Sequence, residues 1–294
     1  MLRPQFVRDQ VGDLELEERH VQNLLKVLRT GNDGWTERTD LQVLFFRLTM
    51  DSATEFLFGE SVDSQLDGLP GSKNQSTHQE KAFAYAFDRG QMYLAKAARL
   101  GDLYWTAHNK DFREQCRICN EFIDYFVQRA LNLKKARTDD KKKYVFLEQL
   151  AEATQDPVQI RTELINILLA GRDTTASLLG YVFVLLAQHP EEFNKLRGKI
   201  LEDFGTFDAP KPISFSGLKN CSYLQWVLNE TLRFYPVVPL NSREAYHDTT
   251  IPVGGGPDGK SPVFIPKGGE VLYSVSVSDS LRFPADHPAS VQID

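Results

Sequence analysis

Cysteine is scarce in this 294-residue chain, which contains three. So odd and sparse a count excludes a disulfide scaffold and fits a reducing compartment. Long basic blocks are also missing, because the longest run of Lys or Arg is residues 141–143. With 40 acidic and 34 basic residues the net charge is −6, so no nucleic-acid partner is expected.

Metal-binding and nucleophile motifs are equally sparse. Cys116 and Cys119 form a Cys-x-x-Cys pair, but no second Cys pair or nearby His pair accompanies them, so ordinary helix packing is the better interpretation and no metal site is predicted. Cys221 opens a later helix and is expected in the core. The glycines of residues 254–256 sit among strands and indicate a hairpin turn, not a phosphate loop.

One long apolar stretch, residues 164–187, contains no proline and suits a helix of six turns or more. Its length would suffice to cross a bilayer, but Arg172 and Asp173 at its midpoint would each cost about 2.5–3.5 kcal/mol there. A core helix of a soluble protein is the favoured interpretation. Residues 1–6 resemble neither a signal nor a transit peptide, so the chain as written is read as cytoplasmic and without an anchor.

Helical periodicity dominates the first two thirds of the chain. Asp40 is placed to cap one helix, Gly59 to end it, and Pro190 to begin another. Short apolar runs between Gly and Pro in residues 242–273 indicate strands in hairpins. The predicted class is mainly α with a small β region. Helices are expected at residues 14–28, 41–58, 81–100, 111–134, 164–187, 191–204 and 220–235, with a surface loop at 61–80 and a charged connector at 136–143.

A polar cluster, residues 170–175, interrupts the apolar stretch with the sequence Ala-Gly-Arg-Asp-Thr-Thr. A glycine, two charges and two threonines cost helix propensity and, if buried, desolvation. A fold keeps such a cluster where the helix passes a cavity that uses it. Further along, Glu230 and Arg233 lie at i and i+3 on one helix face among apolar residues, where they can form a partly buried bidentate pair instead of an ordinary surface one.

Together these two motifs resemble the cytochrome P-450 family of haem-thiolate monooxygenases. The family's central helix carries Ala/Gly-Gly-x-Asp/Glu-Thr-Thr/Ser, which residues 170–175 match at every position, and a later helix carries Glu-x-x-Arg, matched by Glu230 and Arg233. The resemblance covers residues 2–273. Residues 41–49, 56–60 and 254–259 look like the fungal branch that hydroxylates alkanes and fatty acids at the chain end.

The resemblance implies roles for the matched residues. Ala170 and Gly171 would face haem, because they lack bulk. Thr174 would hydrogen-bond to a carbonyl one turn earlier and loosen the helix, opening a groove for water. Asp173 and Thr174 would then relay protons that help cleave the O–O bond of dioxygen. A simple helix kink is the alternative explanation of the threonines.

Further roles follow from the same resemblance. Arg243 would bind a haem propionate, and Val237, Val238, Pro239 and Leu240 would line a pocket for an apolar small-molecule substrate. Electrons would come from NADPH through a cytochrome reductase. The complete parent protein would reside in the endoplasmic reticulum membrane.

The family's Cys loop, whose thiolate holds the haem iron, has no match in this chain. The sequence therefore predicts an incomplete P-450-like domain, residues 1–273, helical to residue 236 and β at 241–276, followed by a divergent tail, 274–294. The chain is expected to be inactive by itself, although the parent would be a monooxygenase acting on fatty acids or alkanes. The alternative is a non-catalytic remnant or an interaction module built on the helical scaffold.

Overall fold

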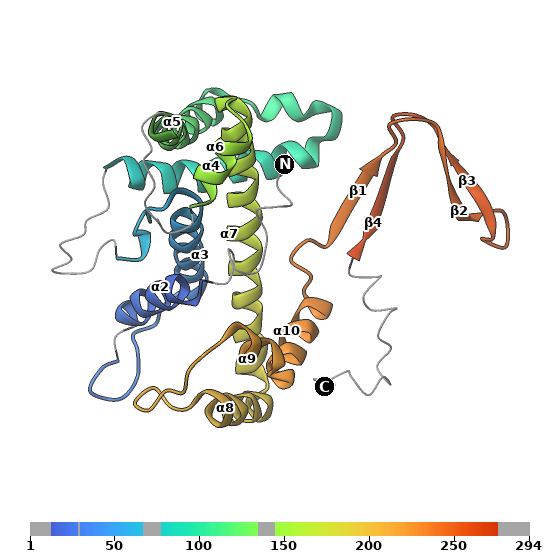
Figure 1. Ribbon diagram of the computed structural model, residues 1–294. Coiled ribbons are helices and arrows are strands. Elements are labelled where there is room, and N and C mark those ends of the chain that lie inside the picture. The colour runs from blue at the N-terminus through green and yellow to red at the C-terminus, as the bar shows by residue number, and fades with distance from the viewer. Residues whose placement is uncertain (1–12, 29, 67–77, 135–144, 276–294) are drawn as a thin grey trace. The chain divides into compact units, whose positions relative to one another are not determined.

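The computed structural model of the protein describes residues 13–28, 30–66, 78–134 and 145–275. The described residues form two compact units, which divide after Gly180 (Figure 1). The first unit is helical, and the second combines helices with short strands, so the predicted class, mainly α with a small β region, is confirmed. The predicted division into a domain and a divergent tail stays a prediction.

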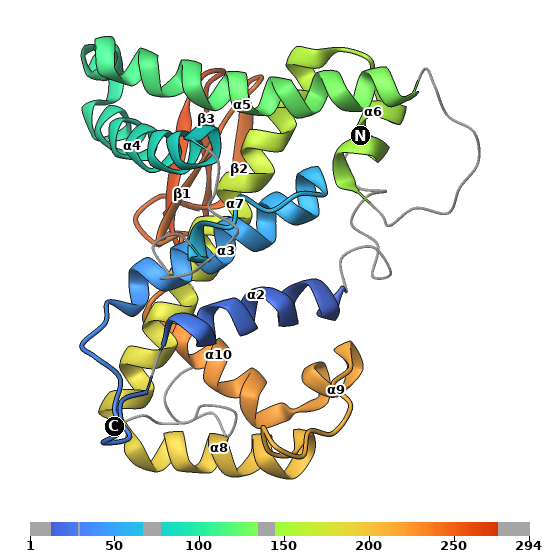
Figure 2. The ribbon, with the colours of Figure 1, turned by 90° about the vertical axis from the view of Figure 1, so that its left-hand side faces the viewer.

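Helices make up the first unit, in which α4 packs along α5 and α2 packs against α3 (Figure 2). Its elements in chain order are α2 (Leu14–Val27), α3 (Leu41–Phe58), the 3₁₀ helix η2 (Ser64–Leu66), α4 (His78–Leu100), the 3₁₀ helix η3 (Gly101–Ala107), α5 (Lys110–Lys134), α6 (Phe146–Ala153) and α7 (Pro157–Gln188), whose last turns belong to the second unit.

The predicted helix ends are confirmed by their capping contacts. The Asp40 carboxylate accepts a hydrogen bond from the Gln42 amide at 3.0 Å, which satisfies one of the free N–H groups of the first turn of α3. Gly59 ends α3 in the left-handed conformation, with φ of 79°, which a residue with a Cβ rarely adopts. Pro190 stands in the first turn of α8 (Pro190–Phe204), as expected.

The first unit differs from the predicted elements at several places, and α7 begins at Pro157, seven residues before the predicted start. The segment 61–66 is not a surface loop, because Val62 and Gln65 are 2% and 1% exposed and η2 holds them against α3. The polar composition of this segment suggested a loop on the surface. Its residues Ser64 and Gln65 instead hydrogen-bond to groups of α3, Asp51 and the Leu44 carbonyl. Helix α6 was not predicted, because its eight residues are too few to show periodicity. The predicted connector at 136–143 lies mostly outside the described residues, as does the rest of the predicted loop up to residue 77.

The core of the first unit gathers apolar side chains from five helices. Phe83, Phe146 and Leu164 are fully buried in it, and Phe83 stacks on Phe122 with ring centroids 4.1 Å apart. A smaller cluster joins Leu24 of α2, the apolar face of α3 and Ala176 of α7. Each large core side chain removed would cost about 3–5 kcal/mol.

A buried carboxylate ties η2 to α3. Asp51 is 1% exposed and accepts hydrogen bonds from the Ser64 amide and hydroxyl, both at 2.7 Å, and from the Gln65 amide at 2.9 Å. Burial raises the pKa of Asp51, and these hydrogen bonds oppose that effect. The carboxylate therefore satisfies three donors, of which the Gln65 amide is buried.

Replacing Asp51 with Asn should lower the free energy of unfolding by about 2 kcal/mol. The two Ser64 donors bond one carboxylate oxygen and the Gln65 amide bonds the other, so an Asn side chain must turn its NH₂ group toward one of these donors. Chemical denaturation measures the difference. Asp40→Asn is the matched control, because Asn caps a helix as well as Asp, and its loss should stay under about 0.5 kcal/mol. Equal losses would contradict the account.

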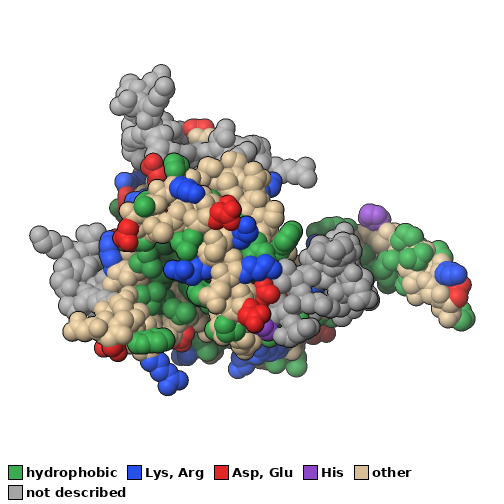
Figure 3. Space-filling model, turned by 90° about the horizontal axis from the view of Figure 1, so that it is seen from below, with side chains coloured by type: hydrophobic (Ala, Val, Ile, Leu, Met, Phe, Trp, Pro, Cys, Tyr) green, Lys and Arg blue, Asp and Glu red, His purple; other side chains and the backbone are tan. Residues whose placement is uncertain are grey.

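The second unit begins with three helices and ends in four short strands. Its elements are α8, α9 (Phe215–Asn220), α10 (Ser222–Phe234), β1 (Leu240–Glu244), β2 (Thr249–Gly255), β3 (Ser261–Ile265) and β4 (Glu270–Ser274). Strand β1 pairs antiparallel with β4, and β2 with β3. The predicted strands and the glycine turn are confirmed, with Gly256 at a φ of 74°. Hydrophobic side chains are exposed on the β2–β3 hairpin (Figure 3), among them Val253 and Phe264.

Candidate functional site

Helix α7 has one buried face and one face that the rest of the first unit leaves uncovered. Ile160, Leu164 and Leu168 repeat every four residues and are fully buried, so this stripe anchors the helix in the first unit. Ala170 and Gly171 are exposed, and a Cβ added to Gly171 would meet no heavy atom within 4 Å. The prediction of a core helix is therefore correct for one face only.

Hydropathy alone does not distinguish the two faces. Among the described residues, α7 is the helix whose length and composition would allow it to cross a membrane, and 22% of its most apolar window is buried. Its uncovered side carries the small residues Ala170 and Gly171 and the hydroxyl residues Thr174 and Thr175 beside apolar ones. This side is where a bound group would find room.

The predicted hydrogen bond of Thr174 is present. Its Oγ1 donates to the carbonyl oxygen of Ala170, one turn earlier, at 2.6 Å. The helix nevertheless stays α-helical from Pro157 to Gln188, so the expected loosening is absent. The reason is that the backbone bonds of an α-helix tolerate a threonine back-bond, which on average bends the helix only slightly. Thr174 thus keeps lone pairs on Oγ1 that can accept a further hydrogen bond.

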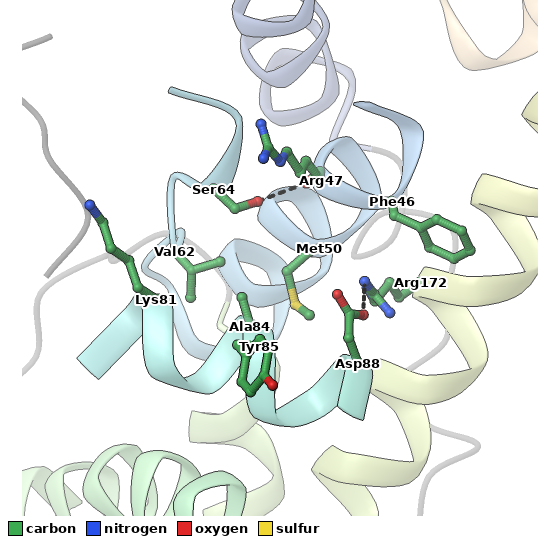
Figure 4. Close-up of a pocket in the computed structure, with 10 residues that line it drawn as sticks. All are labelled: Phe46, Arg47, Met50, Val62, Ser64, Lys81, Ala84, Tyr85, Asp88 and Arg172. Atoms are coloured by element: carbon green, nitrogen blue, oxygen red, sulfur yellow. Dashed lines mark hydrogen bonds and ion pairs between the residues drawn. The ribbon is translucent and has the colours of Figure 1, made fainter. Parts of the chain in front are cut away.

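Arg172 organises the charges of the cluster, a role that sequence reasoning missed. Its side chain is 6% exposed and forms an ion pair with Asp88 of α4 (Figure 4). It forms a second ion pair with Asp173, at 2.9 Å. The guanidinium also lies over the rings of Phe46 and Phe87, 4.8 and 5.5 Å from their centroids. The sequence signal was a charge at the centre of an apolar run, but its partners come from distant helices.

Asp173 is only partly accessible, since its side chain is 32% exposed. Burial raises the pKa of Asp173, while the charge and the hydrogen bond of Arg172 lower it and the nearby Asp88 raises it. The net direction is upward, so this carboxyl holds a proton at higher pH than an exposed aspartate. An acid of this kind next to a hydroxyl is suited to moving protons.

A cavity of about 190 Å³ adjoins this charge cluster in the first unit. Figure 4 shows Arg172 and Asp88 facing each other at its wall, with Met50 and Phe46 beside them. The Nε of Arg172 is buried and has no hydrogen-bond partner. Ion pairing fixes the guanidinium, and through it the carboxyl of Asp173.

Glu230 and Arg233 form the bidentate pair that their spacing predicts. The Arg233 Nε and Nη2 donate to the two carboxylate oxygens at 2.8 and 2.6 Å. Glu230 is 7% exposed and Arg233 is 23% exposed, so the partial burial is confirmed as well. The pair lies in α10 and stiffens its last turns.

The remaining predicted site residues lie in the second unit and are accessible. Arg243 on β1 is exposed and donates to the carbonyl of Ser242 at 2.7 Å. Val237 is half-buried, whereas Val238, Pro239 and Leu240 are exposed. Their predicted contacts with a propionate and a substrate stay predictions.

The three cysteines do not lie on the uncovered face of α7. Cys116 and Cys119 lie on α5, and burial raises the pKa of both thiols, that of Cys119 to about 12. Cys221 is 4% exposed in the core of the second unit, as expected. Within the described ranges no three His, Cys, Asp or Glu side chains group as metal ligands would.

The uncovered face of α7 fits a flat macrocycle such as haem. Ala170 and Gly171 leave open space above the backbone, and the nearest acid and hydroxyl, Asp173 and Thr174, are on the same helix within one turn. A thiolate ligand is a different matter. Burial raises the pKa of both Cys116 and Cys119, so iron binding by either thiol would have to release a proton that the thiol holds more firmly than an exposed cysteine does.

Comparison with known proteins shows the family of this chain. The family model for cytochrome P-450 matches residues 4–278. A cytochrome P-450 monooxygenase, g430, from Fusarium sp is 51% identical over 286 residues, covering 94% of this chain and 50% of that protein. Cytochrome P-450 52A5 from Candida maltosa is 49% identical over 279 residues, covering 94% of this chain and 52% of that protein.

A third relative, cytochrome P-450 52A6 from Candida tropicalis, is 46% identical over 282 residues, covering 94% of this chain and 53% of that protein. The chain spans about half the length of the curated relatives it matches. The predicted resemblance to fungal members is thereby confirmed. The chain belongs to the cytochrome P-450 family.

Proposed function

We propose that this chain is part of a haem-dependent monooxygenase that hydroxylates long-chain apolar substrates, fatty acids or alkanes. The observation that carries the proposal is the uncovered face of α7, where small residues, a partly buried acid and a hydroxyl adjoin open space. The fungal relatives support the substrate class only through the resemblance of this branch.

In this proposal each residue of α7 has a separate task. Ala170 and Gly171 would hold the flat face of haem, which when bound supplies the redox chemistry that activates dioxygen. Arg172 keeps the Asp173 carboxyl in place through its hydrogen bond to Oδ1, which leaves Oδ2 to carry a proton. Thr174 Oγ1 donates to Ala170, so its lone pairs would accept a hydrogen bond from water and pass the proton on.

Further roles are proposed for residues of the second unit by resemblance to the family. Arg243 would bind a haem propionate, and residues 237–240 would line the entry of an apolar chain. Electrons would arrive from NADPH through a cytochrome reductase, and the complete parent would lie in the endoplasmic reticulum membrane. The full-length protein with a reductase and dodecanoic acid or dodecane should give the chain-end alcohol; an absence of hydroxylated product would contradict the substrate assignment.

The 294-residue chain expressed by itself should show no thiolate-type Soret shift when reduced under carbon monoxide. No segment of this chain matches the family's Cys loop, burial raises the pKa of the Cys116 and Cys119 thiols, and Cys221 is 4% exposed. The absorption spectrum measures this, with the full-length protein as the positive control. A clear shift in the chain alone would mean that one of these cysteines binds iron, and single Cys→Ser variants would identify it.

A further inference from the structure

The cavity of about 190 Å³ beside Arg172 has a wall that combines apolar side chains with an excess of positive charge. Three of its lining residues are basic, Arg47, Lys81 and Arg172, and one, Asp88, is acidic. Figure 4 shows Arg172 and Asp88 at one side of the cavity and Lys81 at the other. The remaining lining residues are mainly apolar: Phe46, Met50, Val62, Ala84 and Tyr85, with Ser64. A wall of this kind is suited to an anion with an apolar body.

Arg172 has an edge that its present partners use only in part. The Nε–H of an arginine and the neighbouring Nη2–H are parallel, so together they match the two oxygens of a carboxylate. Here Nη2 donates to Asp88 Oδ1 and Nη1 donates to Asp173 Oδ1, whereas Nε is buried and has no hydrogen-bond partner. A buried donor without a partner is unfavourable, so a ligand that accepts from Nε gains affinity.

Asp88 is a partner that a ligand can displace. Its side chain is 59% exposed, whereas that of Arg172 is 6% exposed. Water can solvate the Asp88 carboxylate once it leaves the guanidinium, so its displacement costs less than that of a buried acid. The guanidinium itself is held over the rings of Phe46 and Phe87, and Asp173 occupies its Nη1. The Nε–Nη2 edge can therefore exchange one carboxylate for another while the arginine stays in place.

We propose that this cavity binds a small monocarboxylate with an apolar body of about one aromatic ring, which replaces Asp88 on the Nε–Nη2 edge of Arg172. The planar carboxylate would accept from both N–H groups, including the one that Asp88 leaves without a partner. The size follows from the volume of the cavity, because a cavity of about 150 Å³ is enough for benzene. The ring would lie against Met50, Val62 and Ala84.

Calorimetric titration of the 294-residue chain with benzoate, benzamide and inorganic phosphate tests the proposal. Benzoate should bind at least roughly tenfold more tightly than benzamide, which has the same ring but no charge. It should exceed phosphate by a similar factor, because phosphate is an anion without an apolar body. No measurable binding of benzoate, or equal affinity for either of the other two compounds, would overturn the proposal.

The variant Asp88→Asn should bind benzoate about tenfold more tightly than the wild type. An amide is a weaker partner for the guanidinium than a carboxylate, and it does not repel the incoming anion. A gain of affinity cannot result from a damaged fold. Glu121→Gln is the matched control, because it removes the same charge from an exposed pair with Arg117 on α5 and does not line the cavity. Its affinity should stay within about twofold of wild type. Unchanged or weaker binding in Asp88→Asn, or an equal gain in both variants, would contradict the displacement of Asp88.

A cavity-filling variant locates the ligand. Ala84→Phe should weaken the binding of benzoate by more than about tenfold, because the new ring takes the volume in which the ligand would lie. Ala95→Phe is its control, since Ala95 is exposed on the same helix and does not line the cavity. Full affinity in Ala84→Phe would place the ligand elsewhere and overturn the proposal. Because the assay needs neither haem nor turnover, its failure would leave the proposed monooxygenase function untouched.

Discussion

Replacing Gly171 with Leu should abolish haem incorporation in the full-length protein without destabilising the fold. No heavy atom lies within 4 Å of a Cβ added at Gly171, and leucine favours a helix over glycine by about 0.8 kcal/mol. The free energy of unfolding of the 294-residue chain should therefore stay equal or rise slightly. The branched side chain would occupy the space in which the macrocycle is expected to lie, so the haem content of the full-length variant should fall below a tenth of wild type.

Gly180→Leu is the control for this experiment. Gly180 is on the same helix, and a Cβ added there also has no heavy atom within 4 Å. It is two and a half turns from Gly171 and therefore lies on the opposite side of the helix axis. This variant should keep its haem, measured by the pyridine haemochrome spectrum of the purified protein. Normal haem content in Gly171→Leu, or equal loss in both variants, would contradict the proposed position of haem.

Replacing Asp173 with Asn should lower the turnover of the full-length enzyme by about a hundredfold. General acid catalysis by a positioned side chain typically contributes this much or more, and an amide cannot replace a carboxyl as proton carrier. Arg172 still finds Asp88 as a partner, so the fold should survive. Steady-state hydroxylation rates measure the loss, and Asp156→Asn at the start of α7 is the control, because Asn keeps the hydrogen bond to the Val158 amide.

The pH dependence of turnover gives a second readout of Asp173. Burial raises the pKa of this carboxyl, so the protonated form that delivers a proton persists to higher pH than in an exposed aspartate. The step that uses it should slow as the pH rises through that raised pKa, and the Asn variant should lose this inflection. An Asn variant with wild-type turnover and the same pH profile would show that another group carries the proton.

Local sequence signals were enough to predict most of the helices. Capping chemistry identified Asp40 and Gly59, because a cap depends on neighbours within four residues. The Glu230–Arg233 pair and the Thr174 back-bond were predictable for the same reason, since each joins residues one turn apart. Contacts between residues one helical turn apart follow from their spacing in the sequence, so they can be predicted from it.

Contacts between distant helices were not predictable in this way. Arg172 pairs with Asp88, which is 84 positions away, and no local pattern indicates that partner. Asp51 and the 61–66 segment present the same problem, because polar residues that read as a loop are buried by their bonds to one carboxylate. The roles of Gly171 and Asp173 toward haem came from resemblance to the family, and they remain proposals.

The central claim is that the uncovered face of α7 is the wall of the haem site. A structure of the full-length protein with haem bound measures this directly, through the distance between the macrocycle and the backbone of Ala170 and Gly171. The account predicts van der Waals contact, at about 4 Å, with Thr174 on the same side of the helix. A macrocycle that contacts other helices, with Gly171 facing solvent, would contradict it.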